Sequence, residues 1–167
     1  MIALIQRVTR AQVDVAGLTV GAIERGILAL IGVEAADTTA MGERLLERIL
    51  TYRVFPDAAG RMNLDLSQVG GGLLLVPQFT LVADTSRGTR PGFSHAASPE
   101  TARSLFEALC EAARARHHVE GRHPVAAGTF GANMQVSLTN DGPVTFNLRV
   151  PPPTSQNFPG PPDSLVL

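Results

Sequence analysis

Apolar positions along the first third of the chain predict short strands separated by glycine-containing turns. Strands are expected at residues 1–8, 12–15 and 19–23, with a turn at Ala16-Gly17 before the third of them. The run from Gly26 to Val33 is apolar at nearly every position, which is typical of a strand with both faces buried. We therefore expect this run in the centre of a sheet.

Two later stretches have the apolar spacing of helices that pack one face on a core. The first should begin after Asp37, a plausible N-cap, and the second after Ser98, because serine is a preferred N-cap and Pro99 suits the first helical position. The two apolar stripes consist of Met41, Leu45, Leu46, Ile49 and Leu50, and of Ala102, Leu105, Phe106, Leu109 and Ala113.

The remaining pattern indicates more strands. A turn is expected at residues 56–60, and an apolar strand at 73–76 should end at the segment Pro77-Gln78-Phe79-Thr80-Leu81. From Ala126 the pattern returns to strands, with a turn at residues 140–143 and a closing strand at 144–150. This order predicts an α+β fold in which antiparallel or mixed sheets, barrel-like or layered, carry two main helices.

The chain divides at about residue 150. Residues 1–150 fit one ordinary domain, since 167 residues with 44% hydrophobic content can bury a continuous core without metals or disulfides. Residues 151–167 carry six of the twelve prolines and almost no periodic apolar pattern. We expect this segment to be a disordered tail.

Composition narrows the function classes. Cys110 is the single cysteine, so no internal disulfide can form, and the first residues lack a leader pattern, which favours the cytoplasm. The apolar runs are far shorter than the about 20 residues that cross a bilayer. Fourteen basic and fifteen acidic residues provide no broad basic surface, so we expect no membrane and no DNA as partner, and any nucleic acid contact should be local.

Individual residues leave their chemistry open. Thr80 could be a hydroxyl nucleophile, but no histidine–acid pair stands beside it, and a β-branched strand residue is the more economical interpretation. His117, His118 and His123 lack metal-ligand spacing and fit a solvated helix terminus better. Cys110 fits a small buried hydrophobe. Gly142-Pro143 is locally a tight turn between strands.

Five stretches of sequence, taken together, indicate a protein family more specifically than any of these single residues does. They keep one order along the chain, and the similarity runs from residue 1 to about 148, including Gly128-Thr129-Phe130-Gly131-Ala132 with Met134. In this respect the chain resembles the D-aminoacyl-tRNA deacylases, which proofread aminoacyl-tRNA. The stretches are Gln6-Arg7-Val8, Gly60-Arg61-Met62-Asn63, Gln78-Phe79-Thr80-Leu81, Gly88-Thr89-Arg90-Pro91 with Phe93, and Asn140 to Thr145.

The resemblance implies a homodimer whose active sites lie at the subunit interface. In such a dimer the Gly-Pro of one subunit, in the cis form, enters the site of the other and excludes L-amino acids sterically; Gly142 and Pro143 match those positions. Glycine lets the backbone approach a ligand closely. Arg7 matches an arginine that braces this segment, although a salt-bridged or phosphate-facing surface arginine is the alternative.

The resemblance also implies a catalysis that needs few side chains and no metal or cofactor. The 2′-hydroxyl of the terminal adenosine helps to activate water, and backbone N–H groups around Gln78, Phe79 and Thr80 hold the developing oxyanion. The partner is the 3′ end of aminoacyl-tRNA, and Phe130 is the candidate stacking wall. The residues expected to bind or select substrate are Arg7, Pro77, Phe130, Met134, Asn140, Gly142 and Pro143.

Pro77 departs from the family pattern, which usually has serine there. A related family that removes L-alanine from mischarged threonine tRNA has proline at this position, and it predicts a trans Gly142-Pro143 bond. Phe79 and the segment Val144-Thr145-Phe146 favour the D-specific family over that relative. A third possibility is a module that binds the aminoacyl-tRNA end without catalysis, because no general base is evident.

Overall fold

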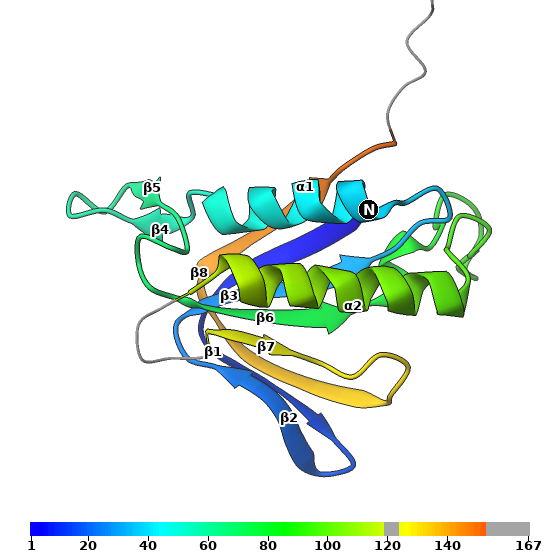
Figure 1. The fold of residues 1–167 in the computed structure, drawn as a ribbon, viewed down its shortest axis with the longest axis horizontal. Coiled ribbons are helices and arrows are strands. Elements are labelled where there is room, and N and C mark those ends of the chain that lie inside the picture. The colour runs from blue at the N-terminus through cyan, green and yellow to red at the C-terminus, as the bar shows by residue number, and fades with distance from the viewer. Residues whose placement is uncertain (119–123, 153–167) are drawn as a thin grey trace, which may run out of the picture.

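The computed structural model describes residues 1–118 and 124–152. Strands and helices alternate irregularly along the chain, in the order drawn in Figure 1. The strands are β1 (Ile2–Val15), β2 (Leu18–Ile23), β3 (Gly26–Gly32), β4 (Phe55–Pro56), β5 (Met62–Leu64), β6 (Gly72–Pro77), β7 (Val125–Ala127) and β8 (Met134–Arg149). The helices are α1 (Thr39–Thr51) and α2 (Pro99–Arg116), with a 3-10 helix, η1, at Phe79–Val82.

Strand β1 organises the main, six-stranded sheet. One of its edges pairs with β3 and β2, and β8 pairs with it from Ile2↔Arg149 to Val15↔Met134. Beyond β3 the sheet continues with β6 and β7, both in parallel pairings. The sheet curls until β2 approaches β7: a Cβ placed on Gly21 would lie 2.8 Å from the Ala127 carbonyl oxygen. The predicted mixed, barrel-like α+β fold is confirmed.

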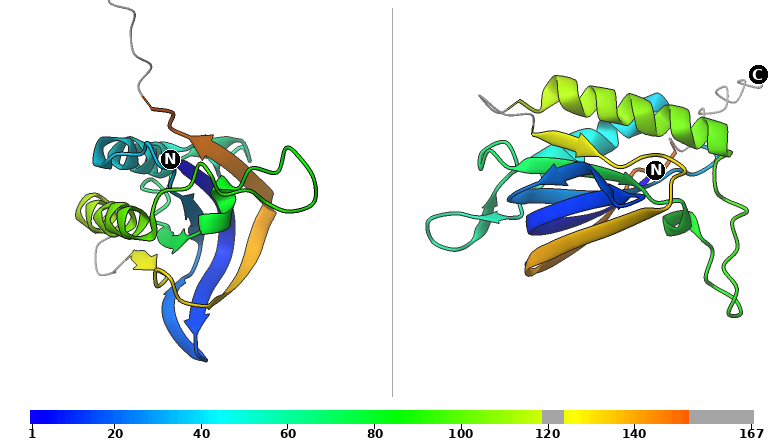
Figure 2. Two further views of the ribbon diagram at one scale, coloured as in Figure 1. Left: turned by 90° about the vertical axis from the view of Figure 1, so that its right-hand side faces the viewer. Right: turned by 90° about the horizontal axis from the view of Figure 1, so that it is seen from below.

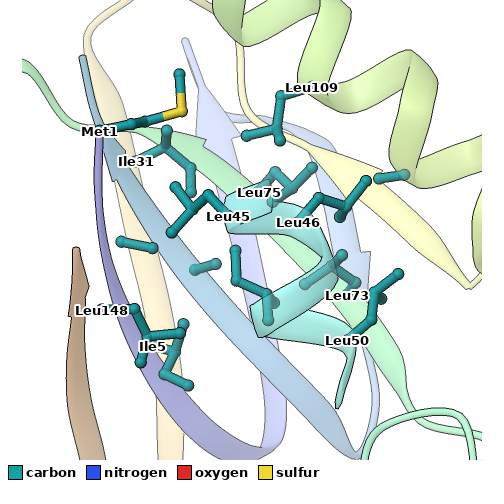
Figure 3. Close-up of a cluster of buried hydrophobic side chains, with 14 of the residues drawn as sticks. Met1, Ile5, Ile31, Leu45, Leu46, Leu50, Leu73, Leu75, Leu109 and Leu148 are labelled. Carbon is teal, nitrogen blue, oxygen red and sulfur yellow. The ribbon is translucent and has the colours of Figure 1, made fainter. Parts of the chain in front are cut away.

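Both helices lie along the same side of this sheet (Figure 1), and the largest apolar cluster lies between them and the strands. Figure 3 shows Leu45 and Leu46 of α1 directed at residues such as Ile31 and Leu75 of the sheet. A smaller cluster that includes Leu28 and Leu74 fills the other side. Strand β3 contributes to both clusters and lies between β1 and β6, as its continuous apolar run predicted.

Two predicted breaks between strands are absent. The structure joins the expected strands at residues 1–8 and 12–15 into β1, and it carries β8 straight through residues 140–143, where a turn was predicted. The Asn140-to-Pro143 segment is a bulge, marked by register shifts between Gln6 and Val8 and between Val8 and Arg10 of β1. The prediction of a turn was wrong because pairing with β1 continues on both sides of the proline.

The predicted N-cap of α1 was off by one residue. Thr38 caps the helix, its hydroxyl accepting the Met41 N–H at 3.4 Å. Asp37 is buried because its carboxylate meets the Met1 ammonium at 2.5 Å and the Glu34 N–H at 2.7 Å. The start of α2 is confirmed, with Ser98 as N-cap and Pro99 in the first turn.

The end of α2 differs from the prediction. His117 is not solvated but 2% exposed, because the chain folds back onto the turn before β6 and the His117 Nε2–H donates to the Gly71 carbonyl at 2.8 Å. His118 is exposed. Cys110 is buried as predicted, and burial raises the pKa of its thiol to about 11. His123 and the predicted tail beyond residue 152 lie outside the described residues.

Candidate active site

An apolar cavity of about 360 Å³ opens where the end of β6 meets the start of α2. Three further segments complete it: the end of β3, the start of η1 and the loop between β7 and β8. No residue lining it in the described part of the chain is ionisable. The lining residues are Ile31, Val33, Pro77, Gln78, Phe79, Pro99, Ala102, Phe106, Phe130, Gly131, Ala132 and Met134.

Two glycines allow the chain to close around this cavity. A Cβ on Gly32 would lie 2.9 Å from Val82 Cγ1, so only glycine lets η1 pack so closely on the end of β3. A Cβ on Gly128 would lie 2.8 Å from the Met134 sulfur, which occupies that space at the cavity wall. The Gln78 N–H donates to the Ile31 carbonyl at 2.7 Å and fixes the point at which β6 leaves the sheet.

The start of η1 borders the cavity, with Phe79 in the lining and Thr80 next to it in the chain. Among the described residues the N–H groups of Phe79 and Thr80 have no hydrogen-bond partner, as expected for the first residues of a helix. The Thr80 hydroxyl accepts a hydrogen bond from Gln78 Nε2 at 2.6 Å. Thr80 was predicted in a strand and instead lies exposed in η1. Its surroundings fit a donor site better than a nucleophile.

Aromatic rings stand at two places around the cavity. Phe130 lies 6.3 Å from Phe106, centroid to centroid, and the Arg103 guanidinium sits 4.9 Å from the Phe130 ring centre. Phe79 is 50% exposed and stacks on Phe93, with ring centres 4.7 Å apart and an angle of 26°. Stacking of Phe130 on a ligand stays a prediction.

The Gly142-Pro143 bulge is held by polar side chains. Arg7 Nε donates to the Asp141 carbonyl at 2.9 Å and approaches the Asp141 carboxylate at 3.1 Å, while its Nη1 donates to the Val54 carbonyl at 2.6 Å. The Arg7 side chain is only 11% exposed. It therefore fixes the backbone directly before Gly142.

Asn140 closes the bulge from within. Its side-chain oxygen accepts the Val144 N–H at 2.6 Å, and its Nδ2 donates to the Val144 carbonyl and the Thr145 hydroxyl. Gly142 has a φ of +148°, and a Cβ there would lie 2.6 Å from Val144 Cγ2, so only glycine fits. The Gly142-Pro143 bond is cis, the form that the resemblance implies, and both residues are exposed.

The structure thus sorts the predicted site residues into two groups. Pro77, Gln78, Phe79, Phe130 and Met134 line the cavity, with Thr80 directly beside Phe79. The residues of the bulge, Arg7, Asn140, Gly142 and Pro143, do not line the cavity of their own chain.

Sequence reasoning missed the contribution of β3 and α2 to the cavity. Ile31 and Val33 come from the end of the central strand, and Ala102 and Phe106 lie one turn apart on α2. All four residues are buried in the main core, as their apolar pattern predicted, but apolar periodicity does not show that a core side chain also faces a cavity. The small size of Ala102 was the one available signal.

Two negative findings concern the described residues alone. In the ranges 1–118 and 124–152, no three His, Cys, Asp or Glu side chains are grouped so as to hold a metal ion. Over the same ranges no helix is long and apolar enough to cross a membrane.

Known proteins with the same pattern cover nearly the whole chain. The family model described as D-Tyr-tRNA(Tyr) deacylase matches residues 4–149. A protein named D-aminoacyl-tRNA deacylase from Methylococcus capsulatus is 60% identical over 91% of this chain and 96% of its own. One of the same name from Thioalkalivibrio sulfidiphilus is 63% identical over 92% of this chain and 99% of its own.

Solved structures share the fold. One described as the c-Myc DNA Unwinding Element Binding Protein superposes with a TM-score of 0.84 at 38% identity, over 90% of this chain and 99% of the other. A second, described as a probable eukaryotic D-amino acid tRNA deacylase, has a TM-score of 0.77 at 16% identity, over 88% and 98% of the two chains, and shows the fold alone. From the family model and the relatives, this chain belongs to the D-Tyr-tRNA(Tyr) deacylase family.

Proposed function

We propose that the chain hydrolyses the ester that joins a D-amino acid to the 3′-terminal adenosine of tRNA. The observation that carries the proposal is the cavity: it is apolar, its described lining has no ionisable group, and the adjoining Phe79 and Thr80 N–H groups have no hydrogen-bond partner among the described residues. Such a site can hold an amino-acid side chain and stabilise an oxyanion, but it has no acid or base of its own. Membership of a hydrolase family agrees with this chemistry.

The hydrolysis needs only water and the substrate's own hydroxyl. Water attacks the ester carbonyl carbon while the adjacent 2′-hydroxyl assists removal of its proton, and the negative charge that develops on the carbonyl oxygen is held by the Phe79 and Thr80 N–H groups. The bond between the carbonyl carbon and the ribose oxygen then breaks. The proton goes to that oxygen, releasing free D-amino acid and tRNA. No metal or cofactor takes part in the proposed reaction.

Selection is proposed to come from a second subunit. The bulge is exposed and does not line its own cavity, which supports the proposal that Gly142 and Pro143 enter the cavity of another copy. Their backbone carbonyls would meet the substituent of an L-residue and leave room for a D-residue or glycine. Arg7 and Asn140 hold the bulge in place, so that it excludes an L-residue instead of shifting to admit it. Glycine mischarged on alanine tRNA would therefore also be cleaved.

A homodimer also accounts for apolar side chains left on the surface. Val136 and Leu138, 36% and 37% exposed, precede the bulge on β8, and Leu18 and Val20 of β2 are 73% and 43% exposed. Exposed apolar residues on β8, the strand that carries the Gly142-Pro143 bulge, suit an interface between two copies of the chain. Such a dimer is proposed to act in the cytoplasm, where aminoacyl-tRNA is found.

Pro77 favours a second candidate, removal of L-alanine from mischarged threonine tRNA. Pro77 ends β6 and lines the cavity, where it offers neither a hydroxyl nor an N–H to substrate. The named relatives and the cis bond agree with the first candidate instead. A non-catalytic tRNA-end-binding module is the remaining alternative.

The test is ester loss from four substrates under the same conditions: D-tyrosyl-, L-tyrosyl-, glycyl- and L-alanyl-tRNA. The proposal expects rapid loss of the D-tyrosyl and glycyl esters and little loss of either L-form. Rapid loss of L-alanine alone would support the second candidate. Binding without any turnover would support the third.

A further inference from the structure

The segment between η1 and α2 contains a motif that the proposed reaction does not use. In both views of Figure 2 this segment projects from the body of the molecule. Its base is closed by two backbone hydrogen bonds, Asp84 N–H to the Gly92 carbonyl at 2.8 Å and Gly92 N–H to the Asp84 carbonyl at 2.9 Å. Residues 84–92 therefore form a hairpin, here called the arm, with Gly88 at a φ of +67° near its tip.

The arm is joined to the mouth of the cavity. It begins two residues after η1, and Phe93, directly after its base, stacks on Phe79, which lines the cavity. The Ala35 N–H donates to the His95 carbonyl at 2.9 Å and ties the return segment to the chain beyond β3. The base of the arm is thus fixed beside the cavity, and its tip projects from the body of the molecule.

Positive charge dominates the arm although the whole chain carries a net charge of -1. Arg87 and Arg90 are exposed, and among the described residues neither takes part in an ion pair or a side-chain hydrogen bond. Asp84 is the arm's one acid, and its carboxylate accepts the Ser86 N–H at 2.9 Å. That bond, the largest of the causes, lowers the Asp84 pKa and keeps the carboxylate engaged at the base.

We propose that Arg87 and Arg90 bind phosphates of the tRNA beyond its 3′-terminal nucleotide, so that the arm is a second substrate contact. The four residues from base to tip extend at most about 13 Å at ~3.3 Å per residue, about the length of four stacked nucleotides at ~3.4 Å each. Arginine suits this task because its planar guanidinium can hold a phosphate through two hydrogen bonds. The inference rests on the proposed function for the identity of the nucleic acid.

The test compares two substrates and two double variants. The substrates are D-tyrosyl-tRNA and 3′-O-D-tyrosyl-adenosine, which carries the ester but no phosphate. Arg87→Glu/Arg90→Glu reverses the charges of the arm, and Arg44→Glu/Arg114→Glu makes the same charge change at exposed positions on the two helices. Thermal melting of each variant checks that it folds, and Arg87→Gln/Arg90→Gln serves as a milder version.

The arm variant should lose about tenfold or more in kcat/KM on D-tyrosyl-tRNA, mainly through KM, and stay within about twofold on the adenosine ester. The dependence of log(kcat/KM) on log salt should become shallower by about 1.4, since each lost single-strand phosphate contact removes ~0.7. The control variant should keep most of its kcat/KM on D-tyrosyl-tRNA and most of the salt dependence. Equal losses on both substrates, an equal loss in the control, or no loss would each overturn the proposal.

Failure of the proposed function gives a different result. If the unaltered protein cleaves neither ester, the catalytic proposal fails, and the arm is then tested by fluorescence anisotropy with uncharged tRNA. Weaker binding by the arm variant than by the control variant would sustain the arm on its own. Equal binding of tRNA by the arm variant and the control variant would contradict the proposal for the arm.

Discussion

The cavity and the Gly142-Pro143 bulge are built by different means. The cavity is held by apolar packing and by backbone contacts such as the bond from the Gln78 N–H to Ile31. The bulge is exposed and is held by the side chains of Arg7 and Asn140. Because the cavity and the bulge are stabilised by different contacts, substitutions in each should have different effects. Changes in the cavity should alter the rate of hydrolysis, and changes in the bulge should alter discrimination between D- and L-substrates.

The largest effect is expected from filling the cavity. Ala102→Leu adds three carbons to a residue that lines the 360 Å³ space and should displace the ester from the N–H groups. We expect kcat/KM on D-tyrosyl-tRNA to fall on the order of 100-fold, because small misplacements of a reacting group have costs of that size. Ser104→Leu, exposed on the same helix, is the control and should keep full activity. Unimpaired activity of the Ala102 variant would show that substrate binds elsewhere.

The next largest effect concerns discrimination. Gly142→Ala places a methyl group against Val144 at a φ of +148° and should shift both carbonyls of the bulge. The ratio of D- to L-tyrosyl-tRNA hydrolysis should fall about tenfold, the effect of about 1.4 kcal/mol, while the D-rate changes little. Gly60→Ala, also at positive φ but with open space around it, should cost stability and leave the ratio intact. An unchanged ratio of D- to L-tyrosyl-tRNA hydrolysis in the Gly142 variant would show that the bulge does not contribute to discrimination.

Arg7→Lys tests the brace with the charge retained. Lysine cannot donate to the Asp141 and Val54 carbonyls with the fixed fork that arginine uses. We expect a several-fold loss of discrimination and a fall of about 1–3 kcal/mol in the free energy of unfolding, because a largely buried contact is left incomplete. The comparison variant is Arg53→Lys, which loses an exposed contact to Asn63. If both variants behave alike in discrimination, Arg7 is only a stabilising residue.

The smallest effect is expected at the Thr80 hydroxyl. Thr80→Val keeps the shape and the backbone N–H while removing the acceptor of the Gln78 contact. If the N–H groups stabilise the oxyanion, kcat should change by no more than about fivefold, since a neutral hydrogen bond contributes about 1 kcal/mol. A loss on the order of 100-fold, measured by single-turnover ester cleavage, would instead make the hydroxyl part of the reaction.

Features set by local sequence could be predicted. The apolar run of β3 and the start of α2 at Ser98-Pro99 follow from burial and helix capping among neighbours. The errors at Asp37, His117 and the β8 bulge have one cause. Each depends on a partner far along the chain: Met1 for Asp37, Gly71 for His117, and β1 for the bulge.

The site was predictable only in part. Family resemblance identified Pro77, Phe79 and Met134, which line the cavity, and it implied that Gly142 and Pro143 serve another subunit; the structure adds that the bulge does not line the cavity of its own chain. Ala102 escaped notice because a small residue in an apolar stripe is normally packed core. The separation of the cavity and the bulge within one chain supports the hypothesis, first suggested by the resemblance, of a site shared between two chains.

A mixed dimer tests most directly whether the bulge of one subunit serves the cavity of the other. Chains carrying Gly142→Ala, with an intact cavity, are co-expressed with chains carrying Ala102→Leu, with an intact bulge, and the hybrid is purified through two different tags. The account predicts that the open cavity of the hybrid receives an intact bulge, so cleavage of L-tyrosyl-tRNA drops below that of the Gly142→Ala protein alone while D-tyrosyl-tRNA is still cleaved. Cleavage of the L-substrate at the level of the Gly142→Ala protein, per open cavity, would contradict it.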